Sequence, residues 1–227
     1  MHASETEARY EARREAASAV VIAVALLAAL ALVSWREGWV LLEFPWWSWL
    51  VLAVPGFVLC VDLWLGARRV GVAGTRVAAL VLLVVIVVGN LVGVAVLVGA
   101  LVTAKSDDLD GIQLLVTTGT IWAANVIVFG LCYWDVDDGG PFERARHERK
   151  TPDFRFPQDE TPEVARPDWH PRVWDYLFVA LTSATAFSPT DTMPLTLKVK
   201  LLVGVEEVVS LVLIVLVTAR AVGLLGS

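Results

Sequence analysis

The chain has 227 residues, of which 57% are hydrophobic, and its formal net charge at pH 7 is −6. So many apolar residues exclude an ordinary water-soluble domain, because several long apolar segments cannot all be buried within one chain of this length. The negative charge, with basic residues interleaved among acids, argues against a nucleic-acid partner.

Five apolar windows each approach or exceed the roughly 20 residues that a membrane-spanning helix needs. They cover residues 17–35, 46–65, 77–102, 112–134 and 195–225. The sequence therefore predicts an all-α integral membrane protein, a helical bundle with five full transmembrane helices and one shorter helix. We expect a multi-pass protein of the cell membrane. The first window lacks an A-x-A exit, so we expect it to be retained as a span.

Polar segments divide these windows into four parts. Residues 1–16 form a charged leader, and residues 17–134 hold four of the spans. Residues 135–172 form a polar loop with six of the ten prolines, so one continuous helix is not expected there. Residues 173–227 hold the short helix, a loop and the last span.

Small and amide residues inside the third and fourth windows predict contacts between helices. Gly89 and Gly93 form a small-xxx-small pattern, which lets two helix backbones approach closely. Asn90 and Asn125 are single amides in apolar segments. Interhelical hydrogen bonds are the expected use of both amides.

Basic residues concentrate in three of the polar segments. They are Arg9, Arg13, Arg14, Arg68, Arg69, Arg76, Arg144, Arg146, Arg149, Lys150, Arg155, Arg166 and Arg172. Because an excess of Lys and Arg marks the cytoplasmic side of a membrane protein, the leader, the second connection and the long loop are predicted to face the cytoplasm.

The polar segments carry no recognisable catalytic or metal-binding motif. The acidic run at residues 135–141 is read as a charged turn, since Gly139 and Arg146 stand where a calcium loop needs acidic ligands. His147 and His170 have no second ligand at zinc spacing. Without a nucleophile–base pair or a phosphate-binding glycine loop, the chain is predicted not to be an enzyme and to have no cofactor or metal.

A shorter apolar segment lies at about residues 172–187 and is followed by a hydroxyl-rich loop that contains Pro189. As a helix of about 15 residues it would be roughly 22 Å long, which is less than the thickness of a bilayer core, about 30 Å. A short helix with a loop is the usual construction of a re-entrant pore segment. The alternative is a tight turn in which Thr190 or Asp191 caps the last helix.

Residues 174–225 resemble the pore-helix, filter and inner-helix module of two-helix potassium channels. The resemblance rests on the runs at residues 175–178 and 182–191, in which Asp191 matches the aspartate at the mouth of the family's filter. It implies a homo-oligomer, a tetramer, with a pore for a monovalent cation on its axis. An inverted pore loop that enters from the cytoplasm, or a short true span, reconciles this module with the predicted orientation.

The filter itself is degenerate between Thr185 and Asp191. Ser188 and Thr190 stand where the family has glycines, with a proline between them. Glycines allow successive carbonyls to turn toward the ion, whereas proline fixes φ near −65°. A wider, less selective filter lined by hydroxyls is therefore expected.

Two adjacent carboxylates, Glu206 and Glu207, lie in the interior of the last window. A carboxylate there costs about 2.5–3.5 kcal/mol or more, so each should face protein or water. Ser210 shares a helix face with either of them. Neutralisation by Lys198, Lys200 or a neighbouring helix is the structural alternative.

The predicted function is passage of a monovalent cation or proton through a pore. The predicted ion pathway consists of Thr185, Ser188, Thr190, Asp191, Glu206 and Glu207. Two alternatives stay open: a proton-coupled secondary transporter that uses Glu206 and Glu207, and a structural membrane subunit that transports nothing.

Overall fold

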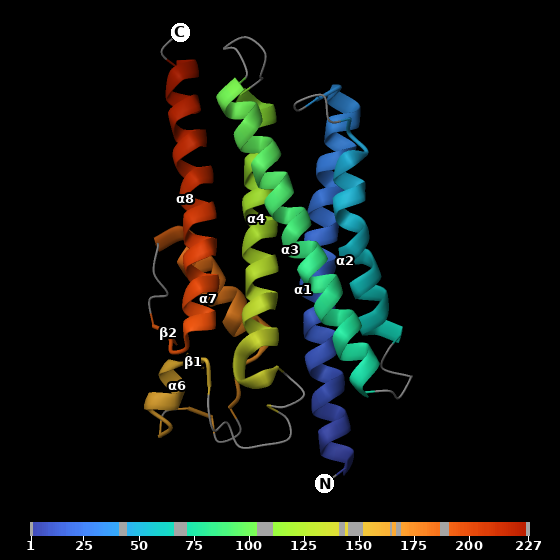
Figure 1. Ribbon diagram of the computed structural model, residues 1–227, viewed down its shortest axis with the longest axis vertical. Helices are drawn as coiled ribbons and strands as arrows, with labels where there is room; N and C mark the ends of the chain where they lie inside the picture. The colour runs from blue at the N-terminus through green and yellow to red at the C-terminus, as the bar shows by residue number, and fades with distance from the viewer. Residues whose placement is uncertain are drawn as a thin grey trace.

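Five long helices run side by side in the computed structural model (Figure 1). They are α1 (His2–Glu37), α2 (Ser48–Leu65), α3 (Val72–Thr103), α4 (Gly111–Val136) and α8 (Leu197–Leu225). The structure describes residues 2–40, 45–65, 72–103, 111–140, 144, 152–163, 165–166, 169–186 and 191–225. Each of the five apolar windows predicted from the sequence lies almost entirely within one of these long helices, as expected where backbone polar groups must be satisfied without water.

In the described part of the chain, three helices are long and apolar enough to cross a membrane, so the chain is a helical membrane protein. These segments are Ala16–Glu37, Gly111–Gly139 and Leu197–Ala219. The described parts of α2 and α3 contain shorter apolar stretches, Ser48–Val61 and Val84–Gly99. Large apolar side chains are exposed on the outside of the bundle, among them Val21, Val54, Phe57, Val88, Val208 and Val215. A lipid environment accounts for such a surface, whereas water does not.

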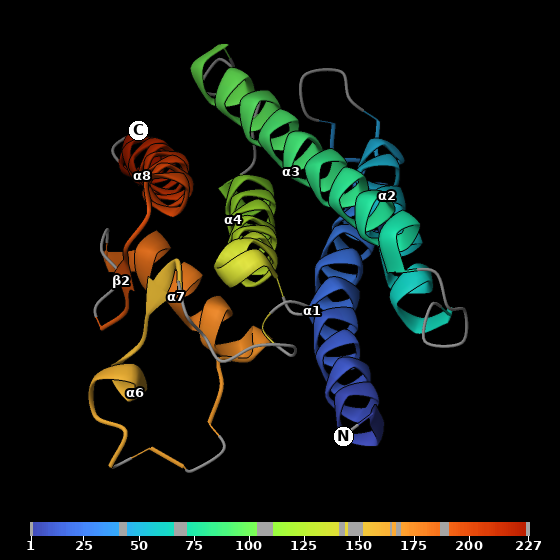
Figure 2. The ribbon, with the colours of Figure 1, turned by 60° about the horizontal axis from the view of Figure 1, so that its bottom comes forward.

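The central helix is α4 (Figure 2). It lies between α7 and α8 on one side and α1 and α3 on the other. Small residues set the close contacts between other helices. A Cβ on Gly56 of α2 would lie 2.9 Å from Val24 Cγ2 of α1. A Cβ on Gly89 or Gly93 of α3 would lie 3.4 or 3.6 Å from the Leu52 side chain of α2, an ordinary contact distance, so α3 packs on α2 at this pattern without an unusually close approach.

The chain turns sharply where α4 ends. A short 3-10 helix, η2 (Asp137–Gly139), follows α4, with positive φ values of 50° at Asp138, 76° at Gly139 and 93° at Gly140. Glycine adopts such angles without steric cost, so the glycine pair permits the change of direction. Beyond the turn, β1 (Phe154–Arg155) pairs antiparallel with β2 (Met193–Pro194), and α6 (Pro157–Glu160) follows β1.

The short apolar segment forms the helix α7 (Val173–Ala186), of 14 residues. It packs against α4 and α8, and β2, which comes after it, lies at the same end of the bundle as β1 (Figure 1). Ser188 and Thr190 lie outside the described residues. The start of α1, the end of α2 and the start of α3 also lie at this end, whereas the C-terminus lies at the other (Figure 1). The elements that flank all three basic segments thus share one end.

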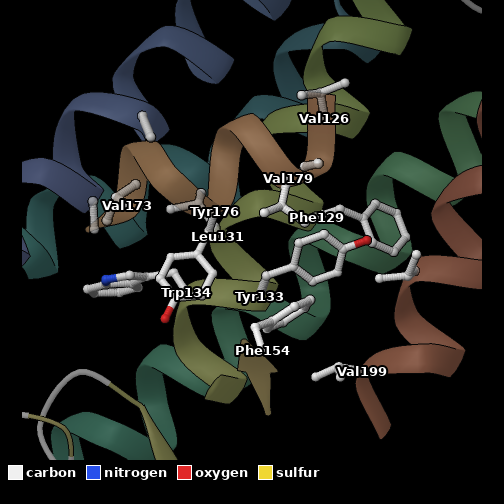
Figure 3. Close-up of a cluster of buried hydrophobic side chains, with 14 of the residues drawn as sticks. Val126, Phe129, Leu131, Tyr133, Trp134, Phe154, Val173, Tyr176, Val179 and Val199 are labelled. Atoms are coloured by element: carbon white, nitrogen blue, oxygen red, sulfur yellow. The ribbon is translucent and has the colours of Figure 1, made fainter. Parts of the chain in front are cut away.

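Two apolar clusters form the interior of the bundle. One joins α1, α4, α7, α8 and β1, and it includes Phe129, Tyr133, Phe154, Tyr176 and Val199 (Figure 3). The other lies toward the opposite end and includes Leu30, Trp49, Leu97, Ile121 and Leu213. The first cluster packs α7 and β1 against α4 and α8.

Gly130 sets the distance between α4 and α7, which yields a test of this packing. An added Cβ would lie 2.6 Å from Leu177 Cδ2 and 3.0 Å from Leu177 Cα, so α7 would have to move. We predict that Gly130→Ala lowers the midpoint of thermal unfolding in detergent, by the equivalent of about 1–3 kcal/mol. Gly119→Ala in the same helix meets nothing within 4 Å and should leave the midpoint unchanged or slightly higher. Equal effects of both substitutions would contradict this packing.

Candidate functional site

A carboxyl group is buried between α4 and α8. Glu206 of α8 is 0% exposed, and its Oε2 accepts a hydrogen bond from the Tyr133 hydroxyl of α4. Its Oε1 has no hydrogen-bond partner in the described part of the chain. A carboxyl group in an apolar interior is therefore paired on one oxygen only. The titratable groups that act on it are Tyr133 and Glu207.

Polar side chains continue from Glu206 along the same helix interface. Asn90 Nδ2 of α3 donates to Asn125 Oδ1 of α4 at 2.7 Å, which confirms the predicted bond between helices. Asn125 Nδ2 in turn lies 3.5 Å from Ser210 Oγ, one turn of α8 beyond Glu206. Ser210 and Asn125 are both 0% exposed. The polar groups thus extend from α8 through α4 to α3, in the middle of the bundle.

A second buried carboxyl group lies closer to the end of the bundle. Asp137 of η2 is 0% exposed. Its Oδ1 accepts the backbone N–H groups of Asp153 at 2.7 Å and Phe154 at 3.0 Å, and its Oδ2 accepts the Tyr176 hydroxyl at 2.5 Å. Sequence analysis placed Asp137 in a charged turn and missed this role. In the sequence, the observation that could have revealed this role is the spacing of four residues between Tyr133 and Asp137, which places both on one face of a helix.

Asp153 joins the loop before β1 to the start of α8. Its carboxylate pairs with Lys198 Nζ at 2.6 Å and accepts the Thr196 hydroxyl at 2.6 Å and the Asp138 N–H at 3.0 Å. Burial raises the pKa of Asp153. The contacts with Lys198, Thr196 and Asp138 together lower it by a larger amount, so the pKa lies below its ordinary value. Lys198, considered above as a neutralising partner for Glu206 or Glu207, is therefore engaged elsewhere.

Aromatic rings lie between the two carboxyl groups (Figure 3). The Phe154 ring is 5.2 Å from the Tyr133 ring and 6.0 Å from the Tyr176 ring, centroid to centroid. The two tyrosine hydroxyls point away from each other (Figure 3). Arg144 donates from Nη1 to the Asp137 carbonyl at 2.5 Å, and its guanidinium lies 5.4 Å from the Tyr176 ring centroid, a cation–π contact.

The residues predicted to form the ion pathway are not all together in one chain. Glu206 is buried, and Glu207 is partly exposed on the neighbouring face of α8. Thr185 and Asp191 are exposed, and the Thr185 hydroxyl donates to the Leu181 carbonyl at 2.8 Å. Ser188 and Thr190 lie outside the described residues. Glu206 is the predicted site residue with a defined polar environment.

No family model, curated protein or solved structure matches this chain. Among the residues that the structure describes, no group of three His, Cys, Asp or Glu side chains could hold a metal ion. The polar groups that meet between α3, α4 and α8 are carboxyl, hydroxyl and amide side chains, and of these the carboxyl group is the one that gains and loses a proton most readily.

The lowered pKa of Asp153 gives a prediction for stability against pH. Because the folded pKa lies below the unfolded one, the stabilisation is fully present above the ordinary Asp value of about 3.9. It is lost as the pH falls through the folded pKa. Thermal unfolding across this acid range should show a shallower loss of stability in Asp153→Asn than in the parent. Glu163→Gln, at an exposed position, should follow the parent, and identical curves for all three proteins would contradict the prediction.

Proposed function

We propose that this protein is a proton-coupled secondary transporter of a monovalent cation, with Glu206 as the proton-binding group. The observation that supports it is the Glu206 carboxyl, fully buried within a helix of membrane-spanning length and paired on one oxygen only. Ionisable side chains inside spanning helices are costly, and they commonly mark ion or proton pathways.

The two oxygens of Glu206 suit a group that gains and loses a proton. Oε2 accepts the Tyr133 hydroxyl whether or not the carboxyl is protonated, so this bond holds the side chain in place in both states. Oε1 has no described partner and is where a proton can bind. Among the described residues no ion pair joins Glu206 to a Lys or Arg. Lys198, one of the two lysines considered above, pairs with Asp153 instead. A proton is then the simplest way to remove the buried charge.

We infer that all five long helices cross the membrane. Their apolar windows, their side-by-side arrangement and their exposed apolar side chains support this inference. The end of the bundle with β1 and β2 then faces the cytoplasm, because the elements that flank the three basic segments lie there.

A cation pore in a homo-oligomer is the second candidate. It is favoured by the path of the chain around α7, which starts and ends at the β1–β2 end of the bundle, as in a re-entrant segment (Figure 1). Thr185 and Asp191 are both exposed in the single chain, as residues that line an axis between copies of the chain would be. Four copies are the arrangement that the potassium-channel resemblance implies.

Proton flux in proteoliposomes tests the proposal. With a cation gradient imposed and a pH-sensitive dye inside, the parent should move protons, and Glu206→Gln should lower the rate by about 100-fold. Glu207→Gln removes the same charge one residue away, from a partly exposed position, and should keep most of the rate. Thermal unfolding checks that each variant is folded.

The same preparations separate the other candidates. Stepwise single-channel currents that fall in Asp191→Asn would favour the pore over the transporter. A folded parent with neither flux nor currents would contradict both and leave a structural subunit. Equal flux in the parent and Glu206→Gln would contradict the role of Glu206.

A further inference from the structure

Two tyrosine–carboxyl pairs lie in sequence along the interior of the bundle, from its β1–β2 end toward its middle. The outer pair is Tyr176 with Asp137, and the inner pair is Tyr133 with Glu206. Tyr133 and Asp137 are four residues apart, or about 6 Å along a helix. Both carboxyl groups are 0% exposed. Two buried carboxyl groups, each of which accepts a tyrosine hydroxyl, thus lie at neighbouring depths.

The Phe154 ring lies between the two pairs. It contacts the Tyr133 ring on one side and the Tyr176 ring on the other, at 5.2 and 6.0 Å between centroids (Figure 3). Phe154 is 0% exposed, and its N–H donates to Asp137 Oδ1 at 3.0 Å. The carboxylate of the outer pair therefore holds in place the ring that separates the two pairs.

We propose that Phe154 is the barrier on the proton route between the β1–β2 end of the bundle and Glu206, and that the carboxylate of Asp137 holds this barrier in place. The proposal rests on the proposed function, since it names the path by which the same site is loaded. When the ring moves aside, water from the β1–β2 end of the bundle can reach Glu206. A proton carried by that water then binds Glu206 Oε1, and the carboxyl group becomes neutral.

The surroundings of the two acids differ in a way that fits these roles. Asp137 has Tyr176 at its carboxylate and Arg144 at its backbone carbonyl, and Asp153 and Lys198 form the adjacent ion pair at the end of the bundle. Its polar neighbours therefore lead outward. The titratable groups that act on Glu206 are Tyr133 and Glu207, and polar contacts continue inward through Ser210.

Phe156 provides a matched control within the same segment. It is 3% exposed, and its ring lies 5.3 Å from the Tyr176 ring and 5.8 Å from the Trp169 ring. A purely structural role for these rings predicts similar effects of truncating either one, whereas a barrier to Glu206 predicts an effect of truncating Phe154 alone.

Chemical labelling of Glu206 tests the barrier without measuring transport. The full chain in nanodiscs is treated with a water-soluble carbodiimide and an amine, and the modified Glu206 is quantified by mass spectrometry against an SDS-unfolded reference. Labelling in the parent should be low. In Phe154→Ala it should rise roughly tenfold, equal to about 1.4 kcal/mol less for opening the site. In Phe156→Ala it should stay near that of the parent.

Graded substitutions keep the test interpretable if the alanine variant does not fold. Phe154→Leu, which fills most of the volume, should label little more than the parent, and Phe154→Val should lie between Phe154→Leu and Phe154→Ala. Unchanged labelling in folded Phe154 variants, or an equal rise in Phe156→Ala, would overturn the barrier. The proposed function fails separately, if Glu206→Gln leaves proton flux unchanged while the labelling pattern is as expected.

Discussion

The hydrogen bond between Tyr133 and Glu206 sets the main constraint on this bundle. A carboxyl group inside an apolar helix must find a partner within the protein, because lipid and apolar side chains supply none. Tyr133 supplies it and thereby fixes how α4 lies against α8. The contact of Asn125 with Ser210, further along the same antiparallel pair of helices, agrees with that register. Packing of apolar side chains alone would specify the register less strongly.

The acids at the end of the bundle are satisfied differently. The Asp137 carboxylate accepts hydrogen bonds from three described groups. The Asp153 carboxylate accepts two and also pairs with Lys198. Such satisfied carboxylates tie the loop after α4 to α7 and α8. Glu206 has one oxygen without a partner among the described residues, so a proton can bind there. A purely structural carboxylate has no need of such an oxygen. This contrast is the physical basis for assigning the transport role to Glu206.

Local patterns in the sequence predicted the helices, the use of Asn90 and Asn125 in hydrogen bonds between helices, and Glu206 as an anomaly, since each depends on composition or spacing within one segment. The partners of Glu206 and Asp137 were not predictable in the same way. Tyr133 lies 73 residues from Glu206 and looks like an ordinary aromatic at the end of an apolar window. Asp137 belongs to an acidic run that is typical of a solvated turn, and only the packing of Phe154 and α7 over it makes it buried.

The most direct measurement of the central claim is the infrared spectrum of the carboxyl groups during a pH titration in nanodiscs. A protonated carboxyl has a C=O stretching band that a carboxylate lacks. The account predicts such a band, which disappears as the proton leaves, in the parent and in Glu207→Gln. Because the other Asp and Glu side chains also give such bands once acid protonates them, the predicted difference is a single band that the parent and Glu207→Gln share and that folded Glu206→Gln lacks. A titrating band of equal intensity in the parent and in Glu206→Gln would contradict Glu206 as the proton-binding group.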